Sequence, residues 1–194
     1  TLLIVTPVSI AWAGLYIKST FTNFKWPYPI IDEAFEWIGK QKTILAWTMV
    51  ISSVVLGIYT GILLSAFNAR PLWNTSILGP LFLTSGLSTG AAFIMILSKN
   101  EHERHALARI DLLLIAIELF LIVHMFMGFL ASTQVQIDAA QMFLGGSFTA
   151  IFWIFVVALG LLLPGILEIM SLKHVKIPYY IAPALVLFGG AMLR

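Results

Sequence analysis

Two long apolar segments joined by a short hairpin constrain this chain more than any other feature. They lie in residues 57–92, GIYTGILLSAFNARPLWNTSILGPLFLTSGLSTGAA, which carry a single charge, Arg70. Each flank is long enough to cross about 30 Å of hydrocarbon. Each also carries small residues four positions apart, where helix backbones can approach closely. The stretch therefore predicts two membrane-spanning helices with a tight turn between them.

The composition agrees with a membrane protein built from helices. Hydrophobic residues make up 60% of the chain and charged residues only 10%, against about 25% charged residues in soluble proteins. The apolar runs are continuous over about 20 residues, whereas the strands of a membrane barrel alternate apolar and polar residues over about 10. The sequence predicts an all-α fold, a polytopic transmembrane helix bundle.

Six membrane spans are expected, all within one integral membrane domain over residues 1–194. Their approximate ranges are 2–17, 43–67, 76–98, 106–130, 146–170 and 178–193. The first and last are short, and the chain begins at Thr1 inside one apolar segment and ends at Arg194 directly after another. We therefore expect a longer protein, truncated here at both ends.

Basic residues indicate which loops share a side of the membrane. They gather in three connections, with Lys18, Lys25, Lys40 and Lys42 in the first, Lys99 and Arg104 in the second, and Lys173 and Lys176 in the third. Basic loops face the cytoplasm in most membrane proteins. Loops 18–42, 99–105 and 171–177 are therefore expected in the cytoplasm, and loops 68–75 and 131–145 outside.

The chain offers few groups that could hold a redox centre. It contains no cysteine, which excludes disulfides and cysteine-held zinc or iron–sulfur clusters within it. His124 is the only histidine well inside an expected span, so this chain alone cannot supply two histidines to a haem. His102, His105 and His174 fall in expected loops, where a solvated charged surface is favoured over a metal site. A redox centre must therefore belong to a partner.

A stripe of small residues runs along the second expected span. Four residues spaced by four share this face: Ser53, Gly57, Gly61 and Ser65. Such a stripe lets a neighbouring helix pack closely. We expect Gly86 and Gly90 of the third span to form the opposing surface.

Tyr59 lies on the same span but points elsewhere. At about 100 degrees per residue, it is about 160 to 200 degrees around the helix from Gly57 and Gly61. It lies roughly 12 Å in from the outer end of the helix, and a buried phenol needs a hydrogen-bond partner. The sequence leaves two hydrogen-bond partners open for the Tyr59 phenol, a ligand carbonyl or a group on a neighbouring helix.

The fourth expected span holds Asp111, Glu118 and His124, with Arg109 just inside its start. Such groups are costly inside a bilayer and are functional candidates by default. Asp111 and Glu118 are seven positions apart and share a face, whereas His124 lies about 120 degrees away. Along the helix axis, Asp111 and Glu118 are about 10 Å apart, and Glu118 and His124 are about 9 Å apart. A proton route along this helix would therefore need waters or polar side chains from other helices between these groups.

Each candidate also has a purely structural interpretation. For Asp111, an interfacial ion pair with Arg104 or Arg109 is favoured over a functional role. Glu168, near the inner end of the fifth span, is expected at the membrane interface. Pro164 in that span is expected to kink or locally unwind the helix.

Several stretches of the chain resemble one family. They are TPVSIAWAGL in the first span, IYTGILLSAFNARPLWN in the second span and hairpin, FLGGSFTAIFWIFVVALGLLLPGILE in the fifth, and PALVLFGGAMLR in the last. In this order they resemble the NrfD family, the integral membrane subunits of polysulfide reductase-like respiratory complexes. The resemblance implies a location in the bacterial cytoplasmic (inner) membrane and a larger pair of four-helix bundles.

The resemblance also implies a function. Family members carry no haem or metal, and exchange electrons between a membrane quinone, menaquinone or ubiquinone, and an iron–sulfur, ferredoxin-like subunit. That partner connects to a molybdopterin or cytochrome subunit. The expected surroundings of the chain are thus these subunits and membrane lipid, with no nucleic acid. The chain would belong to an oxidoreductase complex without carrying its catalytic centre.

Within this resemblance Tyr59 falls on the tyrosine that approaches the quinone head group. Ser52, Thr60 and Leu63 on the same helix are expected to complete this chain's share of the quinone site. Two other functions stay open. One is proton translocation through Glu118, Asp111 and His124, and the other is a passive membrane anchor.

Overall fold

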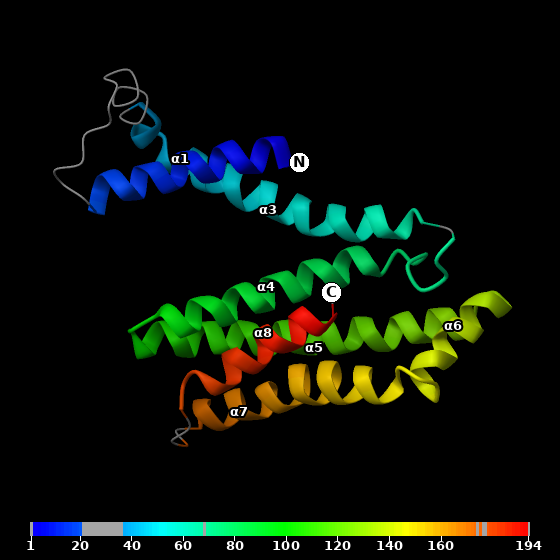
Figure 1. The fold of residues 1–194 in the computed structure, drawn as a ribbon. Helices are drawn as coiled ribbons and strands as arrows, with labels where there is room; N and C mark the ends of the chain where they lie inside the picture. Colours follow the sequence, from blue (N-terminus) through cyan, green and yellow to red (C-terminus); the bar gives the residue numbers. More distant parts are fainter. Residues whose placement is uncertain (1, 21–36, 68, 174, 176–177, 194) are drawn as a thin grey trace. The chain divides into compact units, whose positions relative to one another are not determined.

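All regular structure in the described part of the chain is helical (Figure 1). The computed structural model describes residues 2–20, 37–67, 69–173, 175 and 178–193. In chain order its helices are α1 (Leu2–Thr20), α3 (Lys42–Ser65), α4 (Leu78–Leu97), α5 (Glu101–Leu130), α6 (Gln134–Leu144), the π-helix η1 (Ile151–Leu162), α7 (Leu163–Leu172) and α8 (Ile181–Leu193). The expectation of an all-α fold is confirmed.

Among the described residues, four stretches of helix are long and apolar enough to cross a membrane. They are Lys42–Ser65, Leu78–Leu97, Glu101–Leu130 and Ile151–Leu172, the last of which joins η1 to α7. The apolar helices α1 and α8 are shorter. Together these helices lie where the six spans were expected, as befits a membrane helix bundle.

The chain divides into two compact units, Thr1–Tyr59 and Thr60–Arg194. In the first unit, Trp12 of α1 stacks on Tyr16 with ring centroids 5.8 Å apart. A shallow pocket lies between Trp12 and Trp47 of α3. Most apolar side chains of this part of α3 are exposed. The expectation of a single domain stays a prediction.

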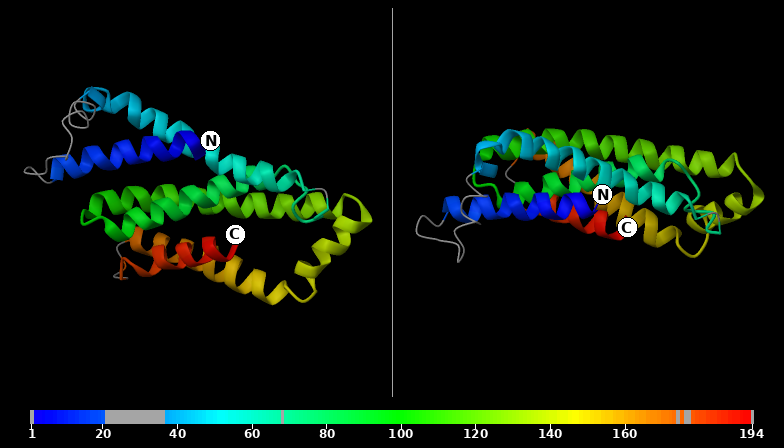
Figure 2. Two further views of the ribbon diagram at one scale, coloured as in Figure 1. Left: turned by 45° about the horizontal axis from the view of Figure 1, so that its top comes forward. Right: turned by 90° about the horizontal axis from the view of Figure 1, so that it is seen from above.

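In the second unit, four helical segments close into a bundle. α4 packs on α5, α5 on α7, α7 on α8, and α8 returns to α4 while also contacting η1. Figures 1 and 2 show these segments side by side from different directions. Side chains from α4, α5 and α8 meet in the core, among them Leu81, Ile122 and Val186. One four-helix bundle is therefore present, and its pairing with a second bundle stays a prediction.

Glycines allow the closest helix contacts in this bundle. A methyl group on Gly61 of α3 would overlap the backbone of Gly79 at the start of α4, and one on Gly190 of α8 would overlap Thr89 of α4. A methyl group on Gly90 of α4 would meet nothing within 4 Å, and its expected contact with the small-residue stripe of α3 stays a prediction. The short hairpin brings the end of α3 against the first turn of α4. The helix α8 packs against a later part of α4, at Thr89.

In the second unit, two pairs of loops meet at opposite ends of the bundle, as the basic residues predict for these loops. At one end, the Gln136 side chain of α6 donates a 3.1 Å hydrogen bond to the carbonyl of Asn74 in the hairpin. At the other end, the Arg104 guanidinium lies 4.5 Å from the ring centroid of Tyr179, just before α8. Loops 68–75 and 131–145 thus share one end, and the connections around Arg104 and Tyr179 share the other. Which end faces the cytoplasm stays a prediction.

Two segments differ from the expectation. Residues 131–145, expected as a plain loop, contain the helix α6, which turns away from α5 before the chain returns through η1 (Figure 2). The fifth span is a π-helix up to Leu162 and an α-helix after it. Pro164 has no N–H, and its ring clashes with the carbonyl four positions earlier in an α-helix. The wider turns of a π-helix relieve that clash, so the expected local unwinding precedes the proline.

Candidate functional site

One face of α5 carries two buried carboxyl groups of the bundle, those of Asp111 and Glu118. Its buried residues recur every three or four positions: Ala108, Asp111, Ile115, Glu118, Ile122, Phe126 and Phe129. This spacing places Asp111 and Glu118 on one stripe facing the core. His124 lies off the stripe, where its exposed ring contacts that of Phe120 in a tilted arrangement, with centroids 4.5 Å apart. The structure therefore gathers Asp111 and Glu118 on one face and leaves His124 on another.

Asp111 is held by the neighbouring helix. The Ser88 hydroxyl of α4 donates a 2.5 Å hydrogen bond to its Oδ1 atom, and the Asp111 side chain is 0% exposed. Arg104 instead pairs with Glu101, at 3.7 Å. The expected interfacial ion pair of Asp111 with a basic residue is wrong, because the α5 face that bears Asp111 turns inward onto α4.

Glu168 of α7 is the second acidic residue at this level. Only 3% of Glu168 is exposed, so it is enclosed by the helices, and its expected position at the membrane interface stays a prediction. Its carboxyl group interacts electrostatically with that of Asp111 across the α5–α7 contact. Within the described residues, Asp111 Oδ2 and both Glu168 oxygens lack a hydrogen-bond partner of good geometry.

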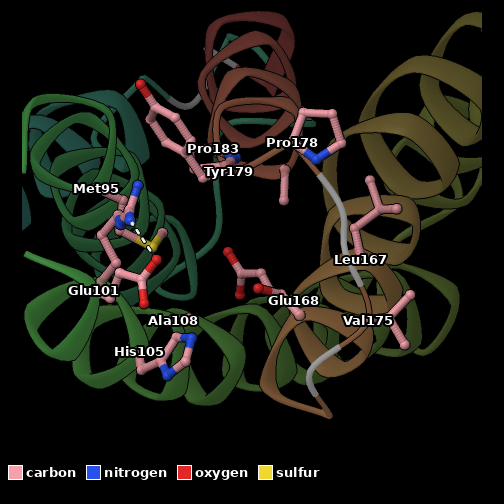
Figure 3. A pocket seen from close by; sticks show the side chains of 13 residues that line it. Met95, Glu101, His105, Ala108, Leu167, Glu168, Val175, Pro178, Tyr179 and Pro183 are labelled. Carbon is pink, nitrogen blue, oxygen red and sulfur yellow. Dashed lines mark ion pairs between the residues drawn. The ribbon is translucent and has the colours of Figure 1, made fainter. Parts of the chain in front are cut away.

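A cavity of about 360 Å³ opens beside Glu168. It is lined by the ends of α4, α5, α7 and α8, with Met95, Ala108, Leu167 and Pro183 among its apolar walls. Figure 3 shows the Glu168 carboxyl group pointing toward the middle of this space. The polar and charged side chains around it are Glu101, Arg104, His105, Ser171 and Tyr179. The cavity thus joins a charged rim to a buried carboxyl group.

The residues expected at a quinone lie along α3. Tyr59 is 45% exposed and Leu63 50%, Thr60 is also exposed, and Ser52 is partly buried. Tyr59 comes seven residues after Ser52, Thr60 follows it directly, and Leu63 comes three residues later. At these spacings the four side chains lie along one side of the helix. Gly61, about 200 degrees around the helix from Tyr59, is buried against Gly79. The phenol of Tyr59 is therefore directed away from the α3–α4 contact.

The sequence analysis missed the pairing of Asp111 with Glu168. Gly160, Pro164 and Glu168 are spaced by four, and all three are buried. That spacing was a usable signal, because a helix face with small residues one and two turns before a carboxylate suits close packing. Among the described residues, no three His, Asp or Glu side chains gather as metal ligands.

The long apolar helices and the carboxyl groups enclosed between them define a multi-pass integral membrane protein. Comparison with known families gives a match over residues 1–194 to the family described as "Polysulphide reductase, NrfD". The chain belongs to this NrfD family.

Curated relatives agree with this assignment. The protein is 37% identical over 155 residues to "Protein NrfD" of Escherichia coli (strain K12), across 75% of its own length and 49% of the relative. It is 36% identical over 121 residues to "Protein NrfD homolog" of Haemophilus influenzae, across 59% of its own length and 38% of the relative. It is 31% identical over 155 residues to a subunit of polysulfide reductase from Wolinella succinogenes, across 73% of its own length and 48% of the relative. It spans about half or less of the length of these relatives, and no solved structure gives a significant match.

Proposed function

We propose that this chain is the haem-free, quinone-reactive membrane anchor of a respiratory oxidoreductase in the bacterial inner membrane. Family membership supports the anchor, and the name of one relative, a polysulfide reductase subunit, supports a place in a complex of several subunits. In this proposal an iron–sulfur subunit exchanges electrons with menaquinone or ubiquinone at the membrane. A molybdopterin or cytochrome subunit then completes the redox pathway.

The exposure of Tyr59 is the observation that carries the quinone proposal. Its phenol lies on an apolar helix, on the side away from the Gly61–Gly79 contact, and 45% of the residue is exposed. A phenol donates a hydrogen bond to a carbonyl oxygen, and apolar side chains such as Leu63 suit a quinone ring. The protein then positions the quinone, while the redox chemistry belongs to the cofactors.

A titration with a fluorescent quinol-site inhibitor tests this role. The wild-type full-length complex is compared with Tyr59→Phe, which removes only the hydroxyl group. Saturable binding that weakens about tenfold, or about 1.4 kcal/mol, is the expected result. Tyr180→Phe is the matched control, because Tyr180 is also an exposed tyrosine, 54% exposed, just before α8. Equal affinity in wild type and Tyr59→Phe would contradict the role of Tyr59.

A second candidate function, proton translocation, rests on Asp111 and Glu118. Both carboxyl groups are buried on the same face of α5, and ionisable groups inside a membrane commonly serve proton routes. We expect Glu118→Gln to lower the number of protons released per electron without weakening quinone binding. Glu103→Gln, an exposed carboxylate on the same helix, is the control. Normal quinone-dependent turnover after substituting both Tyr59 and Glu118 would favour a passive anchor.

A further inference from the structure

Glu168 combines deep burial with unsatisfied oxygen atoms. Only 3% of the residue is exposed, and neither carboxyl oxygen has a hydrogen-bond partner of good geometry in the described part of the chain. The carboxyl group points into the cavity at the end of the bundle (Figure 3). Buried polar groups are almost always satisfied by protein or by ordered water. A cavity of about 360 Å³ has room for several water molecules beside Glu168.

Asp111 of α5 is the buried carboxyl group with which Glu168 interacts. Its Oδ1 atom accepts from Ser88 at 2.5 Å, while its Oδ2 atom lacks a partner of good geometry among the described residues. The Asp111 and Glu168 carboxyl groups interact with each other. Two negative charges side by side in a low-dielectric interior repel strongly, and one shared proton removes that repulsion.

The described contacts of Arg104 and Ser88 bring no positive charge to this pair. Arg104 is directed to Glu101, at 3.7 Å, and to the ring of Tyr179, at 4.5 Å. His105 lines the cavity on the first turns of α5. The side chain that reaches the pair from α4 is the hydroxyl of Ser88, which carries no charge. A proton is therefore the simplest compensation for the second carboxylate.

We propose that Asp111 and Glu168 form a carboxyl pair that holds one shared proton and exchanges it with water in the cavity. In the loading step a hydronium ion in the cavity gives its proton to a Glu168 oxygen and leaves as water. The proton then moves from Glu168 to Oδ2 of Asp111, and Glu168 becomes a carboxylate again. Each transfer breaks one O–H bond and forms another, so no further reactant is needed.

A polar group on α4 continues the path beyond the pair. Ser85 is buried, and its hydroxyl has no hydrogen-bond partner within the described residues. It lies three positions before Ser88, about 4.5 Å along α4. α4 runs antiparallel to α5, so this direction leads toward Glu118. Ser85 is thus placed between Asp111 and Glu118, where a proton route needs an intermediate. This inference rests on the proton translocation proposed above and assigns Glu168 as its entry.

Infrared difference spectroscopy of the full-length protein in lipid vesicles tests the pair directly. A protonated carboxyl group gives a carbonyl band that shifts when H₂O is replaced by D₂O. We expect Glu168→Gln and Asp111→Asn each to remove or displace the same band. Glu103→Gln is the matched control, because this exposed carboxylate bonds the Ser98 hydroxyl at 2.9 Å outside the cavity. Using both Glu168→Gln and Asp111→Asn keeps the test decisive if one variant fails to assemble.

A second readout separates this inference from the proton route as a whole. In the same vesicles, Glu168→Gln is expected to slow proton uptake from the cavity side by about tenfold or more. If the band disappears while Glu118→Gln leaves the proton-to-electron ratio unchanged, the pair stands and the route through Glu118 fails. Bands that are identical in wild type, Glu168→Gln and Asp111→Asn would overturn the pair. Thermal stability that rises with Na⁺ in the wild type but not in Glu168→Gln would indicate a metal cation instead, and would also overturn it.

Discussion

The backbone of Gly160 in η1 lies directly against the backbone of Gly189 in α8, with no side chain between them. A methyl group on either glycine would overlap the other residue. Membrane helices gain stability from such close backbone approach, because van der Waals packing replaces the missing hydrophobic driving force. This contact fixes the distance between η1 and α8.

Substituting Gly189 is therefore expected to destabilise the bundle. Gly189→Leu forces bulk into a filled contact, and we expect a loss of about 1–3 kcal/mol in the free energy of unfolding. Thermal unfolding in detergent measures the change. Gly90→Ala is the control, because a methyl group there would meet nothing within 4 Å. Equal melting temperatures for Gly189→Leu and the wild type would show that this contact does not set the packing.

Removing the Ser88 hydroxyl is expected to leave Asp111 without a protein hydrogen bond of good geometry. Ser88→Ala should lower the free energy of unfolding by about 1–3 kcal/mol, the usual cost of an unsatisfied buried acceptor. Denaturant unfolding measures it. Ser98→Ala removes an exposed serine hydroxyl that bonds Glu103, and we expect a change within about 0.5 kcal/mol. A Ser88 variant as stable as the Ser98 variant would argue that water replaces the hydroxyl at Asp111.

The indole of Trp153 joins η1 to α6. Its Nε1–H group donates a 2.8 Å hydrogen bond to the carbonyl of Phe143. Trp153→Phe keeps an aromatic ring but loses the donor, and we expect a stability loss of about 1 kcal/mol. Trp47→Phe, at an exposed tryptophan that is 64% exposed, is the control in the same unfolding experiment. If both variants lose the same stability, ring volume rather than the hydrogen bond holds α6.

The lack of cysteine makes the orientation easy to measure. Single cysteines at Asn74 and Lys99 are exposed at opposite ends of the second unit. The distribution of basic residues predicts that Asn74→Cys reacts with an impermeant maleimide from outside and that Lys99→Cys reacts from the cytoplasm. Labelling of intact cells and of inverted vesicles separates the two sides. Reaction of both cysteines from one side would contradict the proposed topology.

The sequence predicts the helices well because their signal is local. Continuous apolar runs place α3, α4, α5 and the η1–α7 helix within a few residues. The sequence does not predict α6, which is only 11 residues long and begins with polar residues. The position of α6 depends on hydrogen bonds with Asn74 and Trp153. Both residues lie outside α6 in the chain, so the local sequence of α6 does not reveal these contacts.

The site is predicted less fully because it joins different helices. Seven-residue spacing correctly places Asp111 and Glu118 on one face of α5, but spacing alone does not say which helix faces them. Ser88 and Glu168 come from α4 and α7, and only the closed bundle brings them to Asp111.

The length of α5 links the cavity to the lipid around it. Its 30 residues extend about 45 Å, whereas the hydrocarbon of a bilayer is about 30 Å thick. The helix must tilt or let its polar first turn, which begins at Glu101, stand among the lipid head groups. A thicker bilayer would draw this turn and the cavity mouth toward the acyl chains, and a thinner one would lift them into water. We therefore expect membrane thickness to change how readily water reaches Glu168.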